Sequence, residues 1–123
     1  MTPSILIADD SLLMRKMIAE SLAADGWQIA GEAADGQEAV AQYRQLNPTA
    51  VTLDIVMPGT DGLYALQHIL QHDPQAKIVV VSALSQTKLI SEAIRKGAQD
   101  FIAKPFLPEQ LQTTLRGCVE LSA

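Results

Sequence analysis

Residues 4–10 read Ser-Ile-Leu-Ile-Ala-Asp-Asp, an apolar run that ends in two carboxylates. The pattern recurs three times: residues 50–54 read Ala-Val-Thr-Leu-Asp, residues 78–82 read Ile-Val-Val-Val-Ser, and residues 101–105 read Phe-Ile-Ala-Lys-Pro. Short apolar runs without polar alternation are typical of strands that are covered on both faces. If these runs are parallel strands of one sheet, the polar residues that follow them all emerge at the same edge.

Apolar runs alternate with amphipathic segments five times along the chain. The runs lie near residues 4–8, 27–33, 50–53, 77–82 and 100–103. The segments between them repeat apolar residues at helical spacing. Their stripes are Met14, Met17, Ile18 and Leu22; Ala39, Val40, Tyr43 and Leu46; Leu63, Leu66, Ile69 and Leu70; Leu89, Ile90, Ala93 and Ile94; and Leu111, Leu115, Cys118 and Val119.

Residues suited to helix ends flank several of these segments. Ser11 and Asp35 can cap the first two helices, Gly26 and Gly97 can end the first and fourth, and Pro108 can begin the last. The alternation predicts an α/β fold, a doubly wound (βα)5 flavodoxin-like sandwich with right-handed crossovers. Its parallel five-stranded sheet is expected in the order 2-1-3-4-5, which is known from other folds of this kind.

Size and composition predict one acidic domain that spans residues 1–123. The chain has 48% hydrophobic residues and a formal net charge of -5, which argues against direct binding of nucleic acid. Apolar runs are far shorter than the roughly 20 residues that cross a bilayer, so no membrane insertion is expected. Cys118 is the single cysteine, and no secretory signal is evident; both fit a cytoplasmic protein.

Three carboxylates are expected at the carboxyl edge of the sheet. Asp9, Asp10 and Asp54 would repel one another there, and a hard divalent cation, Mg2+ or Mn2+, would offset that cost. Asp54 is the candidate nucleophile, and the loop at residues 56–62 is expected to leave it open to solvent. The alternatives are ordinary: Asp54 as a loop cap, and Asp10 as a cap of the following helix.

Lys104 and Ser82 complete the expected site. Lys104 is a point charge that can reach a phosphate oxygen, and Ser82 can donate a hydrogen bond to one. Taken alone, Lys104 would be a solvated surface lysine and Ser82 the end of a strand. Together with the carboxylates they provide a nucleophile, a cation site, a hydroxyl and a positive charge, which is what phosphoryl transfer requires.

These motifs make the sequence resemble the receiver domain of bacterial two-component response regulators, over essentially the whole chain. Asp9-Asp10-Ser11 is similar to the family's acidic pair, and residues 53–62 to the segment around its phosphorylated aspartate. Ser82-Ala83 is similar to the switch hydroxyl, and Lys104-Pro105-Phe106 to the lysine-proline signature.

The resemblance implies a phosphorylatable switch. Asp54 would take a phosphoryl group from a phosphohistidine of a sensor histidine kinase. Mg2+ would be bound by Asp10, Asp54 and the backbone carbonyl of Val56, with Asp9 acting through water. Lys104 and Ser82 would contact the phosphoryl oxygens, and the bond to Pro105 would be cis.

The resemblance also assigns a switch role to Phe101, which would turn inward on activation. The surface formed by the fourth helix, the fifth strand and the fifth helix would then change its binding partner. The expected partner is a downstream effector or a motor component, and dimerisation on phosphorylation is left open. Many family members have Tyr at this position. Because Phe lacks the hydroxyl, Phe101 is expected to prefer the buried rotamer more than Tyr would; otherwise it is an ordinary core aromatic.

Side chains near the site suggest a long-lived phosphoryl group. Val56 and Leu84 lie two residues after Asp54 and Ser82, and neither can hydrogen-bond an attacking water. We therefore expect slow self-dephosphorylation. His68 and His72 have a spacing that can bind zinc, but no third ligand is evident and a solvated helix face is the expected interpretation.

Three functions stay open at this point. The first is a phosphorylatable binding module rather than an enzyme, acting alone as a chemotaxis or motility regulator or as the receiver of a larger regulator with a DNA-binding or enzymatic output domain. The second is a small phosphatase or phosphotransferase with an aspartyl nucleophile, although Val56 stands where such enzymes usually have a second Asp and no cap is expected. The third is a receiver-like scaffold that is not phosphorylated.

Overall fold

The computed structural model describes residues 2–57 and 62–120. Within them, parallel strands form one five-stranded sheet in the order β2-β1-β3-β4-β5. The strands are β1 (Ser4–Ala8), β2 (Gln28–Ala33), β3 (Ala50–Leu53), β4 (Ile78–Ala83) and β5 (Asp100–Lys104). The predicted doubly wound flavodoxin-like fold and its strand order are confirmed.

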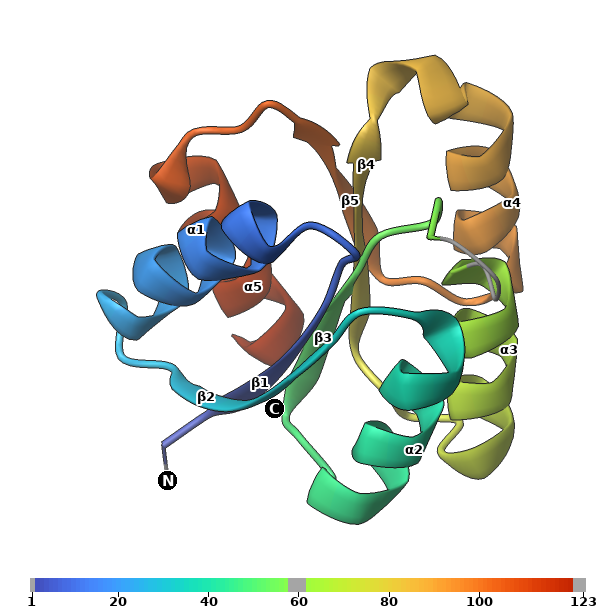
Figure 1. Ribbon diagram of the computed structural model, residues 1–123, viewed down its shortest axis with the longest axis horizontal. Coiled ribbons are helices and arrows are strands. Elements are labelled where there is room, and N and C mark those ends of the chain that lie inside the picture. Colours follow the sequence, from blue (N-terminus) through green and yellow to red (C-terminus); the bar gives the residue numbers. More distant parts are fainter. Residues whose placement is uncertain (1, 58–61, 121–123) are drawn as a thin grey trace.

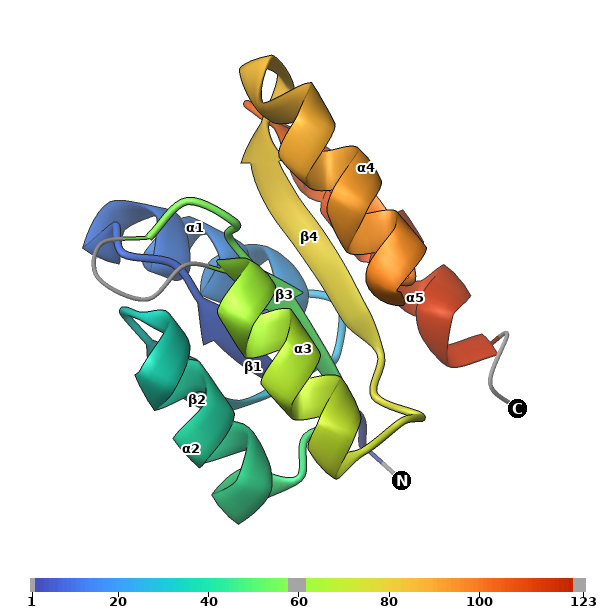
Figure 2. The same cartoon turned by 90° about the vertical axis from the view of Figure 1, so that its right-hand side faces the viewer.

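Helices cover both faces of the sheet. They are α1 (Leu12–Ala23), α2 (Gly36–Leu46), α3 (Gly62–His72), α4 (Thr87–Lys96) and α5 (Pro108–Glu120), with a short 3-10 helix η1 (Leu84–Gln86). Figure 1 shows α1 and α5 on one face and α2, α3 and α4 on the other, and Figure 2 shows the second group from its outer side. This covering explains why the strands lack polar alternation. Among the described residues, no helix is long and apolar enough to cross a membrane.

Side chains of the strands alternate between two hydrophobic clusters. The cluster on the α1/α5 side contains Ile5, Ile7, Ala50, Val79, Val81 and Ile102, together with residues of α1 and α5. The cluster on the α2/α3/α4 side contains Leu6, Ala8, Val51, Leu53, Ile78 and Val80. The inner strands β1, β3 and β4 are therefore fixed in register by burial on both sides, since a slip of one residue would exchange the two sets.

Helix ends largely follow the capping residues. Ser11 Oγ accepts from the backbone N–H of Met14 at 3.2 Å, and Asp35 Oδ1 accepts from that of Glu38 at 2.8 Å. Gly97, with φ 123°, ends α4 as expected. Gly26 does not end α1: the helix stops at Ala23, and Gly26 lies in the turn beyond it with φ 92°.

Three residues of the predicted apolar stripes are exposed, so their assignment to the core is wrong. Met17 is 43% exposed, Leu46 39% and Ile94 40%. Met17 and Ile94 are next to the buried Ile18 and Ala93, and neighbouring residues of a helix point about 100° apart at 3.6 residues per turn. Leu46 is the last residue of α2.

Candidate functional site

Strand alternation decides which polar residues meet at the carboxyl edge. Ile5 and Ile7 face the α1/α5 side, and Asp9 continues their series. Lys104 continues the series of the buried Ile102 in the same way on β5. Asp54 is two residues beyond Thr52 on β3 and falls on this side as well. Three charged side chains from three strands are thus directed to one place.

The ammonium of Lys104 connects the two buried carboxylates. Lys104 Nζ donates to Asp9 Oδ2 at 2.8 Å and to Asp54 Oδ2 at 3.2 Å. The side chains of Asp9 and Asp54 are only 1% and 8% exposed, whereas that of Lys104 is 21% exposed. Buried charges are stable only when they are paired and hydrogen-bonded, and here the lysine supplies both.

Backbone N–H groups hold the other oxygens of these two carboxylates. Asp9 Oδ1 accepts from the backbone N–H of Ser11 at 2.9 Å, and Asp54 Oδ1 accepts from that of Val56 at 3.1 Å. Each carboxylate is therefore anchored from two sides. This arrangement fixes the direction of the Asp54 carboxylate before any ligand arrives.

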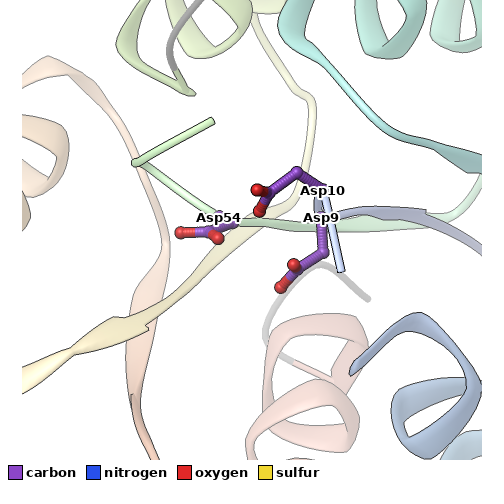
Figure 3. Close-up of side chains that lie close together, drawn as sticks. All are labelled: Asp9, Asp10 and Asp54. Atoms are coloured by element: carbon purple, nitrogen blue, oxygen red, sulfur yellow. The ribbon is translucent and has the colours of Figure 1, made fainter. Parts of the chain in front are cut away.

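Asp10 adds a third carboxylate to the group. Asp9, Asp10 and Asp54 each offer an oxygen, and these oxygens lie within 4.8 Å of one another. Figure 3 shows the three carboxylates close together, with those of the neighbours Asp9 and Asp10 pointing in different directions. Asp10 is exposed while the other two are buried. An all-oxygen set of this size, open on one side, fits Mg2+, which takes one or two carboxylates and keeps several waters.

Burial and charge shift two pKa values in the site. Burial raises the pKa of Asp54 above its ordinary value of 3.8, Lys104 and the N–H of Val56 oppose this, and Asp9 adds to it. Burial alone would lower the pKa of Lys104, but its bonds to Asp9 and Asp54 outweigh burial and raise it. The lysine therefore keeps its positive charge at neutral pH.

The structure brings Asp9, Asp10, Asp54 and Lys104 together as predicted. Ser82 is at the same edge, near the end of β4, and is 2% exposed. The expectation that Asp54 is open to solvent is wrong. Asp54 is 6% exposed, because Lys104 and the backbone after β3 cover it. Residues 58–61 of the loop that was expected to expose it lie outside the described residues.

The expected switch residues have mixed outcomes. The Lys104-Pro105 bond is cis, as the resemblance implied. Phe101 is 40% exposed in this structure, and its stronger preference than Tyr for a buried rotamer stays a prediction. Phe101 lies on β5, the edge strand, where fewer neighbours cover a side chain. Val56 and Leu84 are 49% and 66% exposed, and their apolar side chains flank the edge.

The two histidines of α3 contact different tyrosines. The ring centroids of His68 and Tyr64 are 4.1 Å apart, and those of His72 and Tyr43 are 6.4 Å apart. In the described part of the chain, Asp9, Asp10 and Asp54 are the group of acidic, His or Cys residues placed to hold a metal ion. The histidines therefore offer no support for a zinc site.

Arg15 is a residue of the site that the sequence did not reveal. Its Nη1 donates to the backbone carbonyl of Asp9 at 2.7 Å, and its Nε donates to Glu32 Oε1 at 2.9 Å. The position of Arg15 four residues after the helix cap Ser11 is a weak signal that its side chain can return toward the start of α1. Its partner Glu32 is known only once β2 is placed beside β1.

Comparisons with known proteins agree with this geometry. The sequence profile of the family described as "Response regulator receiver domain" matches residues 5–116. The chemotaxis protein CheY of Thermotoga maritima is 45% identical over 111 residues, which is 90% of this chain and 92% of that protein.

Solved structures are similar over nearly the whole chain. The receiver domain of NtrX from Brucella abortus has a TM-score of 0.89 at 33% identity, covering 94% of this chain and 98% of that one. A structure of the CheX-CheY-BeF3-Mg+2 complex from Borrelia burgdorferi has a TM-score of 0.86 at 34% identity, covering 98% of this chain and 89% of that one.

Proposed function

The chain belongs to the family of response regulator receiver domains, and from that premise we propose that it is a single receiver domain, residues 1–123, whose Asp54 is phosphorylated. The phosphoryl group would come from a phosphohistidine of a sensor histidine kinase. The observation that carries the proposal is the contact of Lys104 Nζ with both buried carboxylates, 2.8 Å from Asp9 and 3.2 Å from Asp54. It gives a preformed pocket with a nucleophile and a charge for the incoming group.

The proposed reaction is a transfer between two side chains. A carboxylate oxygen of Asp54 attacks the phosphorus, a bond from that oxygen to phosphorus forms, and the bond from phosphorus to the histidine nitrogen of the donor breaks. The electron pair of the broken bond stays on the imidazole nitrogen. The chain supplies positioning and charge neutralisation, which dominate catalysis of phosphoryl transfer.

Three side chains and one backbone N–H group have separate roles in this proposal. The Val56 N–H and Lys104 hold the Asp54 carboxylate in place, and Lys104 then shifts its bond to a phosphoryl oxygen. Ser82 donates to another phosphoryl oxygen. The Asp9 carboxylate keeps Lys104 at the pocket during the transfer, since their 2.8 Å bond does not involve Asp54.

A divalent cation is part of the proposal because the donor set fits one. Mg2+, or Mn2+ in its place, would be held by Asp10, Asp54 and the backbone carbonyl of Val56, with Asp9 acting through water. When bound, it would neutralise charge on the phosphoryl oxygens. The family relationship and the spacing of the three carboxylates support this assignment.

The proposed output is a change of partners on the face formed by α4, β5 and α5. Phosphorylation adds about -1.5 to -2 charges, which would draw Ser82 and Lys104 toward Asp54. Phe101 would then move from its 40% exposed position into the space behind Ser82. Pro105 would hold the turn that presents Lys104.

Fluorine NMR tests the movement of Phe101. Phe101 and Phe106 are the two phenylalanines of the chain, so fluorophenylalanine labelling gives two resonances, which Phe106→Leu assigns. We expect the Phe101 resonance to lose its solvent isotope shift when Mg2+ and a phosphodonor are added. An unchanged isotope shift in fully phosphorylated protein contradicts the switch.

The proposed setting is bacterial-type signalling in the cytoplasm. Similarity to CheY along 90% of the chain favours a chemotaxis or motility role, with an effector or motor component as the partner. A receiver that belongs to a larger regulator is the second candidate within this class. An aspartyl-phosphate enzyme has less support, because Val56 offers no side-chain acid or base two residues after Asp54.

Intact mass spectrometry tests the central proposal. Wild type and Asp54→Ala are incubated with an acyl phosphate donor, each with Mg2+ and with EDTA. We expect wild type to gain the mass of one phosphoryl group with Mg2+ and the variant to gain none. A variant that gains the same mass as wild type would refute Asp54 as the acceptor.

A further inference from the structure

Arg15 joins the acidic pocket to the edge strand of the sheet. Its side chain is 15% exposed and forms an ion pair with Glu32 of β2, with Nε 2.9 Å from Oε1. The Nη1 atom of the same guanidinium donates to the Asp9 carbonyl at 2.7 Å. Glu32 is held in turn, because Gln42 of α2 donates to its backbone carbonyl. One planar fork thus connects α1, β2 and the end of β1.

The carbonyl that Arg15 binds belongs to the peptide unit between Asp9 and Asp10. Because the peptide is planar, holding its carbonyl restricts ψ of Asp9 and φ of Asp10, and so the directions in which both side chains leave the backbone. Asp9 N–H donates to the Ala33 carbonyl at 2.9 Å, and Asp9 Oδ1 accepts from Ser11 N–H at 2.9 Å. With Arg15 bound to the carbonyl and Lys104 bound to Oδ2, all four polar atoms of Asp9 are hydrogen-bonded.

We propose that Arg15 is a positioning residue for cation binding, which sets the relative direction of the Asp9 and Asp10 carboxylates through the peptide between them. This inference rests on the proposed function, since it takes the acidic cluster to be a cation site. Groups that orient metal ligands without touching the metal commonly change metal affinity by about tenfold or more when they are removed.

The sign of the effect separates positioning from simple electrostatics. A guanidinium beside a cation site repels the cation, so an Arg15 that acted only through its charge would weaken Mg2+ binding, and its removal would tighten it. Removing the guanidinium would also leave Glu32, 2.9 Å from it, without its partner, which adds to that tightening. Loss of orientation has the opposite sign, and we expect it to dominate, so that Arg15→Gln weakens Mg2+ binding.

Calorimetric titration with Mg2+ alone is the measurement, on wild type, Arg15→Gln, Arg15→Lys and Arg116→Gln. We expect Arg15→Gln to weaken Mg2+ binding about tenfold. Arg15→Lys keeps the charge but replaces the planar fork with a compact ammonium, which does not reproduce its geometry, so it should also weaken Mg2+ binding. Arg116→Gln is the matched control. It breaks the 2.8 Å ion pair between Arg116 and Asp25, which involves none of the three carboxylates of the site, and it should leave Mg2+ binding unchanged.

Thermal unfolding with and without Mg2+ separates this role from a structural one. At a fixed Mg2+ concentration, stabilisation by a ligand grows with the logarithm of its affinity, so the Mg2+-dependent rise in melting temperature should shrink in Arg15→Gln. A lower melting temperature in EDTA with an undiminished Mg2+-dependent rise, or Mg2+ binding as tight as in wild type, would overturn the proposal. If Arg15→Gln does not fold, Arg15→Lys decides by the same criteria. Wild type that binds no Mg2+ would overturn the proposed cation site itself, and this inference with it.

Discussion

Thr52 lies on the central strand β3 and Asp54 directly follows that strand on the same side of the sheet, yet the two have different surroundings. Both are buried, at 1% and 6% exposure. Thr52 Oγ1 has no hydrogen-bond partner among the described residues, whereas both Asp54 oxygens have one. Apolar side chains surround the middle of the strand, while the edge gathers charged groups from three strands. The interior of the sheet therefore provides stability, and its carboxyl edge provides the partners that chemistry needs.

The largest expected effect is in the interior. Leu6 is 0% exposed in the centre of the sheet, so Leu6→Ala should lower the free energy of unfolding by about 2–5 kcal/mol. Leu13→Ala is the control, because Leu13 is 70% exposed and its loss should change stability by less than about 0.5 kcal/mol. Urea unfolding measures both, and similar losses for the two variants would refute the contrast.

The next effect is at the edge. Lys104→Met should lower the free energy of unfolding by about 2–3 kcal/mol, because it leaves the buried carboxylates of Asp9 and Asp54 without their cation. Mg2+ should restore part of that loss, since it replaces the missing charge. Lys96→Met breaks the exposed pair with Glu92, at 3.9 Å, and should cost under about 0.5 kcal/mol. The same loss in EDTA and in Mg2+ would contradict this account of the pocket.

Replacing the acid itself should stabilise the fold. Burial raises the pKa of Asp54, so ionised Asp54 is less favourable in the folded state than in the unfolded chain. Wild type then loses stability as pH rises from below the ordinary pKa of 3.8 to above the raised folded pKa, and Asp54→Asn does not. We expect the variant to be more stable at neutral pH by on the order of 1 kcal/mol, with no advantage at low pH.

Thr52→Val provides the matched control for that pH dependence. It removes a buried hydroxyl without a partner and should stabilise the protein by about 1 kcal/mol at every pH. Urea unfolding at several pH values distinguishes the two variants. If the gain from Asp54→Asn were equally independent of pH, the difference between edge and interior would not be electrostatic.

The last effect is on a rate and not on stability: it concerns the lifetime of the proposed phosphoryl group. Val56 and Leu84 are exposed beside the site and cannot hydrogen-bond an attacking water. Val56→Asn and Leu84→Glu should therefore speed decay of phospho-Asp54, by up to about tenfold, or 1.4 kcal/mol of barrier. Leu107→Glu, at another exposed leucine, is the control. Decay in wild type as fast as in the first two variants would count against the hypothesis.

Much of the fold could be predicted because its signals are local. The apolar runs, the helical stripes and the caps Ser11 and Asp35 are set by neighbouring residues, and parallel pairing then gathers Asp9, Asp54 and Lys104. The sequence could not show that Lys104 would bridge both acids and bury Asp54. That outcome depends on the rotamer of one long side chain.

Two other features depend on which strands become neighbours. Glu32 of β2 is 17 residues further along the chain than Arg15. Arg15 acquires its role only when β2 is placed beside β1. Phe101 is exposed because β5 is the edge strand, whereas the apolar pattern around it indicates only that a strand is present. Contacts between distant segments are thus the part that periodicity does not encode.

The most direct test of the central claim is to locate the phosphoryl group. The protein is treated with an acyl phosphate donor, reduced with borohydride to mark any aspartyl phosphate, digested, and its peptides are sequenced by mass spectrometry. The account predicts one mark, on Asp54, which appears with Mg2+ and disappears in EDTA. A mark on another carboxylate, or an equal yield without the cation, would contradict it.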